Sequence, residues 1–296
     1  MVIRRSVGEK IFDIFNCIFM LGLIILTLYP LLYVLFASVS DPKLLMGFEG
    51  FLIKPLGKWT LEGYKLTLSN PNVVTGYRNT LFYVVAGTAI NVVMTALGAF
   101  CVTRKHFGLK NPMLIMLTIT MFFSGGMIPL FLIVQTLNIY NTVWAILLPG
   151  AISSWNLIIM KTFFEGIPES LEESATIDGA SDWDVFIRII LPLSKPVIAV
   201  MVLFYGVNNW NAWFNHMIFL RDRQLFPLQL FLREILMLNA SASGQTPTVG
   251  AMITQSYYKE LLQYCVIIVA TVPILCIYPF LQKYFVKGVM IGAIKG

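Results

Sequence analysis

The side chains best suited to recognising a polar molecule gather in residues 208–215. This stretch combines amides with tryptophans, namely Asn208, Asn209, Trp210, Asn211, Trp213 and Asn215. Aromatic faces can stack on sugar rings, and amides can hydrogen-bond to hydroxyl groups. A candidate substrate path therefore comprises Asn208, Trp210, Asn211, Trp213 and Asn215. Amides inside an apolar run must pair or face a cavity, so the pattern favours the alternative of a tryptophan belt with interhelical hydrogen bonds.

A second polar stretch, residues 173–196, is dense in Glu and Asp and lies between two long apolar runs. Just before it, Pro168 and Glu169 suit the first turn of a helix, because Pro fits there and acidic side chains complement the helix dipole. Gly179 stands where a left-handed residue would cap that helix. These signals predict a short helix over residues 168–178.

A second short helix is expected directly after the first. Ser181 and Asp184 form a capping-box-like start, and Pro192 would stop the helix before Pro196 opens the next apolar run. Its apolar face would consist of Trp183, Phe186, Ile187, Ile190 and Leu191. Small residues, which allow another surface to approach closely, lie where the chain reverses: Ser174, Ala175, Gly179 and Ala180. The stretch therefore predicts a compact docking unit rather than a simple turn.

Groups for metal binding or covalent catalysis form no recognisable pattern. Cys17, Cys101, Cys265 and Cys276 all lie inside apolar runs without a C-x-x-C spacing, and the two histidines are far apart. The sequence holds no H-E-x-x-H and no G-x-x-x-x-G-K-[ST]. We therefore expect no metal site, no bound cofactor and no enzyme activity in this chain, and a membrane-embedded enzyme is disfavoured.

Composition indicates an integral membrane protein. Of 296 residues, 57% are hydrophobic and 12% are charged, whereas soluble domains average about 25% charged residues. The net charge of +6 comes from basic residues spread over loop ends. Because that pattern is ordinary for membrane proteins and forms no basic helix or groove, nucleic-acid binding is not expected.

Six apolar runs are long enough to be membrane-spanning helices, which need about 20 residues each. They lie near residues 11–38, 77–103, 112–135, 142–164, 196–220 and 261–286. The cluster of Gly125, Gly126 and Pro129 is the best candidate for a break or hinge inside a span. The prediction is an all-α, multi-pass protein of the cell membrane, with residues 1–296 forming a single transmembrane domain.

Lys and Arg residues predict the orientation. Basic residues gather at the N-terminal end (Arg4, Arg5, Lys10), in the turn after the second run (Arg104, Lys105, Lys110) and near the C-terminus (Lys283, Lys287, Lys295). The positive-inside rule then places both termini in the cytoplasm. With six spans, the loop 165–195 is cytoplasmic, and the segments 41–76, 137–141 and 221–260 lie outside.

The loop also carries a specific resemblance. Glu173-Ser174-Ala175, then Gly179, then Ile189-Ile190-Leu191-Pro192 resemble the E-A-A, three residues, G, nine residues, I-x-L-P motif of ABC importer permeases. Ser174 replaces the middle Ala and keeps its small size. The flanking sequences, including Leu191-Pro192-Leu193-Ser194-Lys195-Pro196, are similar to the carbohydrate-uptake subgroup and the maltose-type second permease. Residues 209–215 and 226–233 look like permeases for complex oligosaccharides.

The resemblance implies a type I ABC importer permease whose loop 165–195 is a coupling helix seated in a groove of a cytoplasmic ATPase. It assigns docking to Glu173, Ser174, Ala175, Asp178, Gly179, Ala180, Leu191 and Pro192. The implied partners are a second permease in a heterodimer, two ABC ATPases that bind ATP and Mg²⁺, an extracellular solute-binding protein and a sugar substrate, in contact with membrane lipid.

Two other functions stay open at this point. The first is an ABC importer for a non-sugar solute such as a peptide, because the motif is shared across import systems. The second is a secondary transporter, which would need ionisable residues inside the membrane. The predicted spans contain almost none, since Asp13 and Arg78 lie at span ends.

Overall fold

The computed structural model describes residues 7–104, 107–242, 258–276 and 279, and these residues contain helices and no strand. Within them, three helices are long and apolar enough to cross a membrane: α1 (Val7–Ser38), α4 (Pro71–Thr103) and the helix Tyr258–Cys276. A fourth crossing is available if the bent pair Asp182–Leu193 and Lys195–Asn211 is one span. The all-helical class is as predicted, whereas the count of six spans stays a prediction.

The chain divides into two compact units. The first comprises residues 1–70 and 234–271, with α1, the short helices α2 (Pro42–Leu45) and α3 (Glu62–Ser69) and most of the helix Tyr258–Cys276. Its described core is built from Ala37, Leu45, Leu52, Leu261 and Cys265. A hydrogen bond of 2.6 Å between the hydroxyls of Ser38 and Tyr64 joins α1 to α3.

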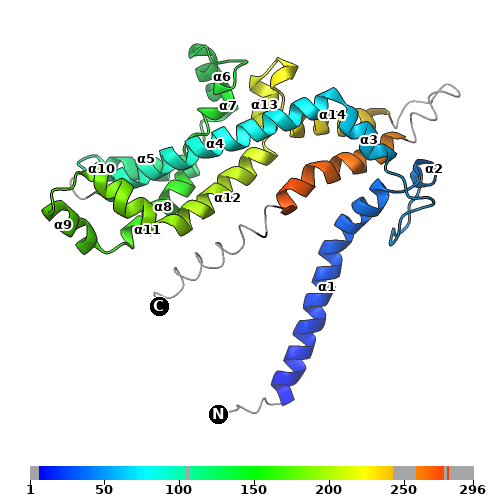
Figure 1. Ribbon diagram of the computed structural model, residues 1–296, viewed down its shortest axis with the longest axis horizontal. Coiled ribbons are helices and arrows are strands. Elements are labelled where there is room, and N and C mark those ends of the chain that lie inside the picture. The colour runs from blue at the N-terminus through cyan, green and yellow to red at the C-terminus, as the bar shows by residue number, and fades with distance from the viewer. Residues whose placement is uncertain (1–6, 105–106, 243–257, 277–278, 280–296) are drawn as a thin grey trace. The chain divides into compact units, whose positions relative to one another are not determined.

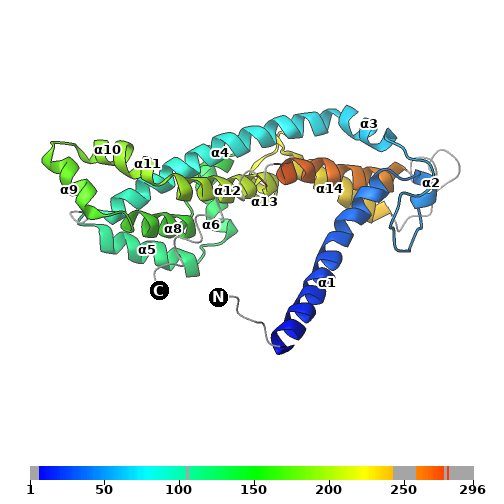
Figure 2. The same cartoon turned by 60° about the horizontal axis from the view of Figure 1, so that its bottom comes forward.

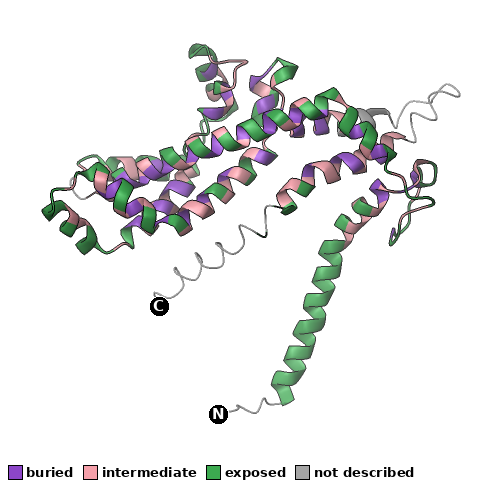
Figure 3. Cartoon of the chain, in the orientation of Figure 1, coloured by how far each residue is buried: buried purple, intermediate pink, exposed green. Residues whose placement is uncertain are grey.

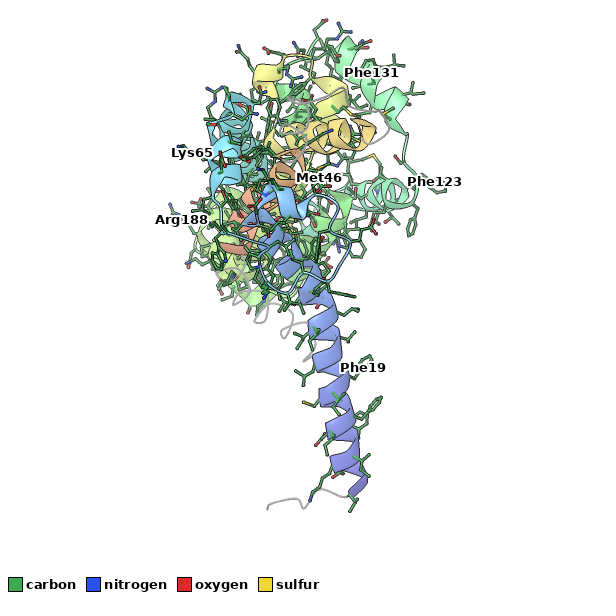
Figure 4. The ribbon with its side chains drawn as sticks, turned by 90° about the vertical axis from the view of Figure 1, so that its right-hand side faces the viewer. Phe19, Met46, Lys65, Phe123, Phe131 and Arg188 are labelled. Carbon is green, nitrogen blue, oxygen red and sulfur yellow. The ribbon has the colours of Figure 1, made fainter. Side chains whose placement is uncertain are left out.

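Helix α1 agrees closely with the first predicted span. It is apolar, and its side chains are exposed along almost its whole length, as Figure 3 shows in green. Phe19, labelled in Figure 4, points outward from this helix. Exposed apolar surface on a 32-residue helix is what a lipid-facing span requires.

The second unit comprises residues 71–233 and 272–296 and is organised around α4. Helix α12 (Lys195–Asn211) and helix α8 (Ser154–Glu165) pack against α4 (Figures 1 and 2). The core of the second unit contains, among others, Ala96, Ala99, Phe100, Met160, Phe186, Ile190 and Met201. Helix α4 has 33 residues, which corresponds to about 50 Å of helix.

Small residues recur along α4 where other segments approach. A Cβ atom added to Gly76 would lie 2.9 Å from the Leu228 Cα, and one added to Gly98 would lie 2.9 Å from the Leu157 Cδ1. At Gly87, halfway between them, the neighbour would be the Asn209 side-chain nitrogen at 2.9 Å. The three glycines are eleven residues apart, or about three helical turns, and therefore share one face of α4.

The predicted spans 112–135 and 142–164 are each interrupted. The first consists of α5 (Lys110–Phe122) and α6 (Met127–Thr136), and the second of α7 (Trp144–Leu147) and α8. Gly126 has a φ of 84°, which a residue with a side chain rarely adopts, so α5 cannot continue through it. With 13 residues, α5 measures about 20 Å, less than the ~30 Å hydrocarbon layer. The side chain of Phe123 at this break points outward (Figure 4).

The predicted span 196–220 is also not one helix. Helix α12 ends at Asn211, the backbone is extended at Ala212, and α13 (Phe214–Phe219) follows. A 3₁₀ turn, η2 (Arg223–Leu225), leads to α14 (Leu228–Ala242), so a helix occupies part of the segment that was expected only as an outer loop. The Ser/Gly/Thr-rich centre of that segment and the end of the predicted last span, residues 277–286, fall largely outside the described residues.

Candidate docking loop and substrate path

The predicted docking unit consists of two short helices, as expected. The first is α9 (Glu169–Ile177), close to the predicted 168–178. Gly179 has a φ of 83°, the Ala180 N–H donates to the Ala175 carbonyl at 2.9 Å, and the Gly179 N–H donates to the Thr176 carbonyl at 3.0 Å. This pair of bonds is the Schellman motif, in which a left-handed glycine satisfies the last carbonyls of a helix. The sequence-based prediction of a glycine cap is therefore confirmed.

The second helix begins at the predicted capping box. The Asp184 backbone N–H donates to the Ser181 Oγ at 3.2 Å, and the Ser181 backbone N–H donates to the Asp184 Oδ2 at 3.3 Å. The Ser181 hydroxyl also donates to that carboxylate oxygen at 2.6 Å. These hydrogen bonds from Ser181 hold the pKa of Asp184 below its usual range, because they favour its charged form. The cap thus fixes the path of the chain out of the Gly179 turn.

The sequence did not indicate how the second helix continues. After α10 (Asp182–Val185), residues Phe186–Ile190 form a π-helix, η1, followed by α11 (Leu191–Leu193). The chain then bends by 80° into α12. The wider π turn buries Phe186 and Ile190 and leaves Trp183 and Ile187 exposed, so only part of the expected apolar face is covered by this chain. π turns inside helices often mark functional positions.

The predicted docking residues divide into two groups. Glu173, Ser174, Asp178, Gly179 and Pro192 are exposed. Ala175, Ala180 and Leu191 instead pack partly against the core of the second unit, where they fix α9 and α10 in place.

One exposed residue of the loop was missed by the sequence analysis. Ile177 is 86% exposed at the end of α9, and its apolar side chain offers contact area to another surface. Its position between the Ala175 and Gly179 of the motif was the available signal.

An acidic cavity of about 600 Å³ lies between this loop and the ends of α4 and α8. Its lining includes Thr103, Arg104, Phe164, Glu165, Ile167, Glu169, Glu172, Glu173, Thr176, Ile177, Asp182 and Val185. Carboxylates outnumber the one basic residue in that set, so the cavity suits basic side chains of a partner protein.

Arg104 forms an ion pair with α9 that sequence reasoning missed. Its Nη1 and Nη2 donate to the Glu172 Oε2 at 2.5 Å and the Glu172 Oε1 at 2.8 Å. Its guanidinium carbon also lies 4.2 Å from the centre of the Phe100 ring. Close by, Glu165 accepts from the Lys161 Nζ at 2.7 Å. The sequence indicated Arg104 only as a marker of the cytoplasmic side, because Glu172 lies 68 positions further along the chain and gives no local signal.

One amide within residues 208–215, that of Asn209, forms hydrogen bonds between helices. Asn209, which was not among the candidates, donates from Nδ2 to the Asn91 Oδ1 at 3.1 Å and to the Thr88 Oγ1 at 3.3 Å. The Asn91 Nδ2 donates to the Gly150 carbonyl at 2.5 Å. This network links α12, α4 and the turn before α8. Asn209 thus follows the alternative of interhelical hydrogen bonds.

Trp210 is 5% exposed, and its ring centre lies 6.3 Å from that of Tyr77. It also lines an apolar cavity of about 500 Å³ between α4 and α12. Trp210 therefore acts in helix packing, and its burial offers no open face to a polar ligand.

The remaining candidates of the path are more accessible. Asn208, Asn211 and Asn215 are exposed, and the Asn211 Nδ2 donates to the Val207 carbonyl one turn back at 2.9 Å. Trp213 is partly exposed at the junction of α12 and α13, with the Arg233 guanidinium 4.3 Å from its ring centre. An aromatic face beside a cation is a combination that can hold a sugar ring bearing a negative group.

The described residues contain no cluster of three or more His, Cys, Asp or Glu side chains that could hold a metal ion. His216 is 1% exposed, and its ring centre lies 4.7 Å from that of Tyr83, so it packs rather than ligates. The candidate functional surfaces are therefore the exposed part of the loop 165–195 and the exposed residues among 208–215.

Residues 4–214 match the family described as the binding-protein-dependent transport system inner membrane component. That match covers more than two thirds of the chain. The chain belongs to this family. It is a membrane protein, and its part in the transport system is that of a permease subunit, which is non-catalytic. Membership of this family favours an ABC importer permease over a secondary transporter and over a membrane-embedded enzyme.

Similar proteins extend the match to nearly the full length. The protein LplC of Bacillus subtilis (strain 168) is 41% identical over 294 residues, which cover 99% of this chain and 98% of LplC. The polygalacturonan/rhamnogalacturonan transport system permease protein YtcP of the same organism is 36% identical over 288 residues, covering 97% of this chain and 99% of YtcP.

The fold is also similar to that of a solved structure. A chain of a bacterial ABC transporter involved in the import of the acidic polysaccharide alginate matches with a TM-score of 0.86 and 29% identity, over 95% of this chain and 99% of that chain. The likeness supports the type I ABC permease fold expected from the motif.

Proposed function

We propose that this chain is the permease subunit that carries a sugar or oligosaccharide across the cell membrane in an ATP-driven ABC importer. The relatives with named substrates, YtcP and the alginate transporter, act on saccharides, and both align over nearly the whole chain. A peptide importer would share the motif in the loop but not these substrates. Residues 1–296 then form one permease domain with six spans and cytoplasmic termini.

The loop 165–195 is the docking element for an ATPase. The observation that supports this assignment is an exposed helix–turn–helix, capped at Gly179 and Ser181, in a chain of the family of transport-system inner membrane components. Glu173, Ser174, Asp178, Gly179 and Pro192 form its outer surface, and Ala175, Ala180 and Leu191 hold it against the core. ATP and Mg²⁺ are bound by that partner.

The complete importer contains this chain, a second permease, two ATPase subunits and an extracellular solute-binding protein. Closure of the ATPases moves the docking elements as rigid bodies and switches the pore between inward-open and outward-open forms. Asn208, Asn211, Trp213 and Asn215 are the residues offered to the saccharide, whereas Trp210 is committed to packing.

Cross-linking tests the docking assignment. In the assembled importer, with the native cysteines replaced, Ile177→Cys is expected to form a cross-link to the ATPase subunit, because this side chain is 86% exposed on α9. The cross-link is read by gel shift, with and without ATP.

The matched control is Leu137→Cys, which is 61% exposed in the turn after α6 and is predicted to lie outside the cell. It should give no cross-link to the ATPase. A cross-link from position 137 and none from position 177 would reverse the predicted orientation and remove the docking assignment.

A further inference from the structure

The ion pair between Arg104 and Glu172 is a strong polar attachment of helix α9 to the rest of the second unit. None of the residues of α9 is fully buried, and its apolar hold on the core comes from the small Ala175. The Arg104–Glu172 pair adds a two-point fork from the end of α4 to the first turns of α9. A helix held by so little apolar area depends on such a fork for its position.

The geometry of this ion pair distinguishes it from ordinary surface pairs. Both side chains are about four-fifths buried, with 21% and 22% exposed. Two parallel N–H···O bonds fix the plane of the carboxylate relative to the guanidinium, which a single contact cannot do. The Phe100 ring supports the guanidinium from α4 itself. The Arg104 side chain is thus fixed to α4 and transmits displacement.

The other end of this connection reaches the far end of the second unit. Along α4, Asn91 is tied to Asn209 of α12, and Asn79 donates from Nδ2 to the Phe226 carbonyl at 3.0 Å. A single 33-residue helix therefore runs from the docking loop to the segment beyond α13. A rigid-body shift of α4 would carry a displacement at Glu172 to that far segment.

We propose that Arg104 is a positioning residue that straps the docking helix α9 to α4, so that movement of the docking loop is converted into movement of the permease core. This role rests on the proposed docking function of the loop. It predicts that loss of the strap lowers the amount of substrate transported per ATP hydrolysed, while the ATPase stays bound to the loop.

The test measures substrate transported per ATP hydrolysed in vesicles containing the whole importer. Arg104→Ala should lower this ratio by about two- to thirtyfold, the range by which mutations that alter coupling usually act. ATPase activity and the Ile177→Cys cross-link should persist. Arg104→Lys keeps the charge but loses the fork, so it should give an intermediate ratio.

Two further variants separate positioning from general damage to the fold. The swap of Arg104→Glu with Glu172→Arg should recover a large part of the ratio. Arg221→Ala removes an exposed arginine on the predicted outer side, away from the docking loop, and should leave the ratio unchanged. If Arg104→Ala does not assemble, Arg104→Lys and the swap supply the same readout.

The strap is ruled out if Arg104→Ala, or Arg104→Lys in its place, transports with the wild-type ratio. It is also ruled out if the swap recovers nothing while each single variant still assembles. Either result, obtained with the Ile177→Cys cross-link intact, removes the strap and leaves the docking assignment standing. If Ile177→Cys gives no cross-link to the ATPase in a chain that keeps Arg104 and Glu172, the docking assignment itself is removed.

Discussion

At the scale of single residues, Gly179 determines the shape of the docking loop. Its φ of 83° lies in the left-handed region, where a Cβ atom is strained. Apart from Gly179 and its two neighbours in the sequence, no described residue has an atom within 4 Å of where that Cβ would stand. The requirement for glycine inside this chain is therefore one of backbone conformation and not of crowding.

Gly179→Asp is expected to abolish uptake while the protein still inserts in the membrane. The aspartate strains the left-handed turn, and it places a charged side chain on the surface offered to the ATPase. Uptake of labelled substrate and the amount of protein in membrane fractions measure the two effects. Gly179→Asn, whose side chain tolerates this backbone better, is the control for the turn itself. Normal uptake by the aspartate variant would contradict the docking role of this residue.

Residues whose partners lie close in the sequence were predictable, and those with distant partners were not. The Gly179 cap and the Ser181–Asp184 box are local hydrogen-bond motifs, so the sequence spelled them out. The Arg104–Glu172 fork and the Asn91–Asn209 bond depend on how helices pack, which single-sequence patterns do not reveal.

At the scale of elements, the packing face of α4 depends on glycines. At Gly76, an added Cβ would meet backbone: the Leu228 Cα at 2.9 Å and the Leu228 nitrogen at 3.1 Å. At Gly98, the atom met at 2.9 Å is the end of the flexible Leu157 side chain. The two positions lie on one helix face but differ in how far their neighbours can yield.

Gly76→Ala is expected to destabilise the assembled permease by about 1–3 kcal/mol, the usual cost of forcing extra volume into a packed interior. The start of α14 must move, because backbone cannot rotate away as a side chain can. Thermal unfolding of the purified complex measures the change. Gly98→Ala is the matched control and should cost less, since the end of Leu157 can turn aside. An equal or larger loss at Gly98 would show that backbone contact does not govern packing on this face.

Elements were predictable where composition alone decides them. The first span appeared as expected because a long apolar run forms a helix whatever surrounds it. Gly125, Gly126 and Pro129 indicated a break, and α5 does end just before it. The π turn at Phe186–Ile190 had no signal in the sequence, whereas the bend of 80° falls between Pro192 and Pro196, where one helix was predicted to end and the next to begin.

At the scale of the whole molecule, the chain is one part of a larger machine. Its family is described as the inner membrane component of a binding-protein-dependent transport system, and we propose that a partner ATPase imposes the movement. Composition was enough to predict a membrane protein, and one twenty-residue motif was enough to predict the type of transporter. We propose that the choice of substrate depends on the exposed candidates Asn208, Asn211, Trp213 and Asn215 and on partner subunits, and neither contribution has a specific motif in the sequence.

A ligand screen on the assembled importer tests the substrate class. Saccharides are expected to stimulate ATP hydrolysis in the presence of the solute-binding protein, and uronate oligosaccharides more than neutral ones. The physical reason is that the Arg233 guanidinium beside Trp213 favours a negatively charged sugar. Neutral oligosaccharides of matched length are the control. Stimulation by peptides and by no saccharide would overturn the proposed function.

The open space around Gly179 makes two explanations for its identity experimentally separable. A D-alanine installed there by chemical ligation would accept the left-handed backbone without strain. A transport defect in that semisynthetic protein would not come from strain in the Gly179 turn, and it would point to the space that a docked subunit leaves there. The D-residue thus separates the effect of backbone conformation at Gly179 from the effect of steric fit at the interface.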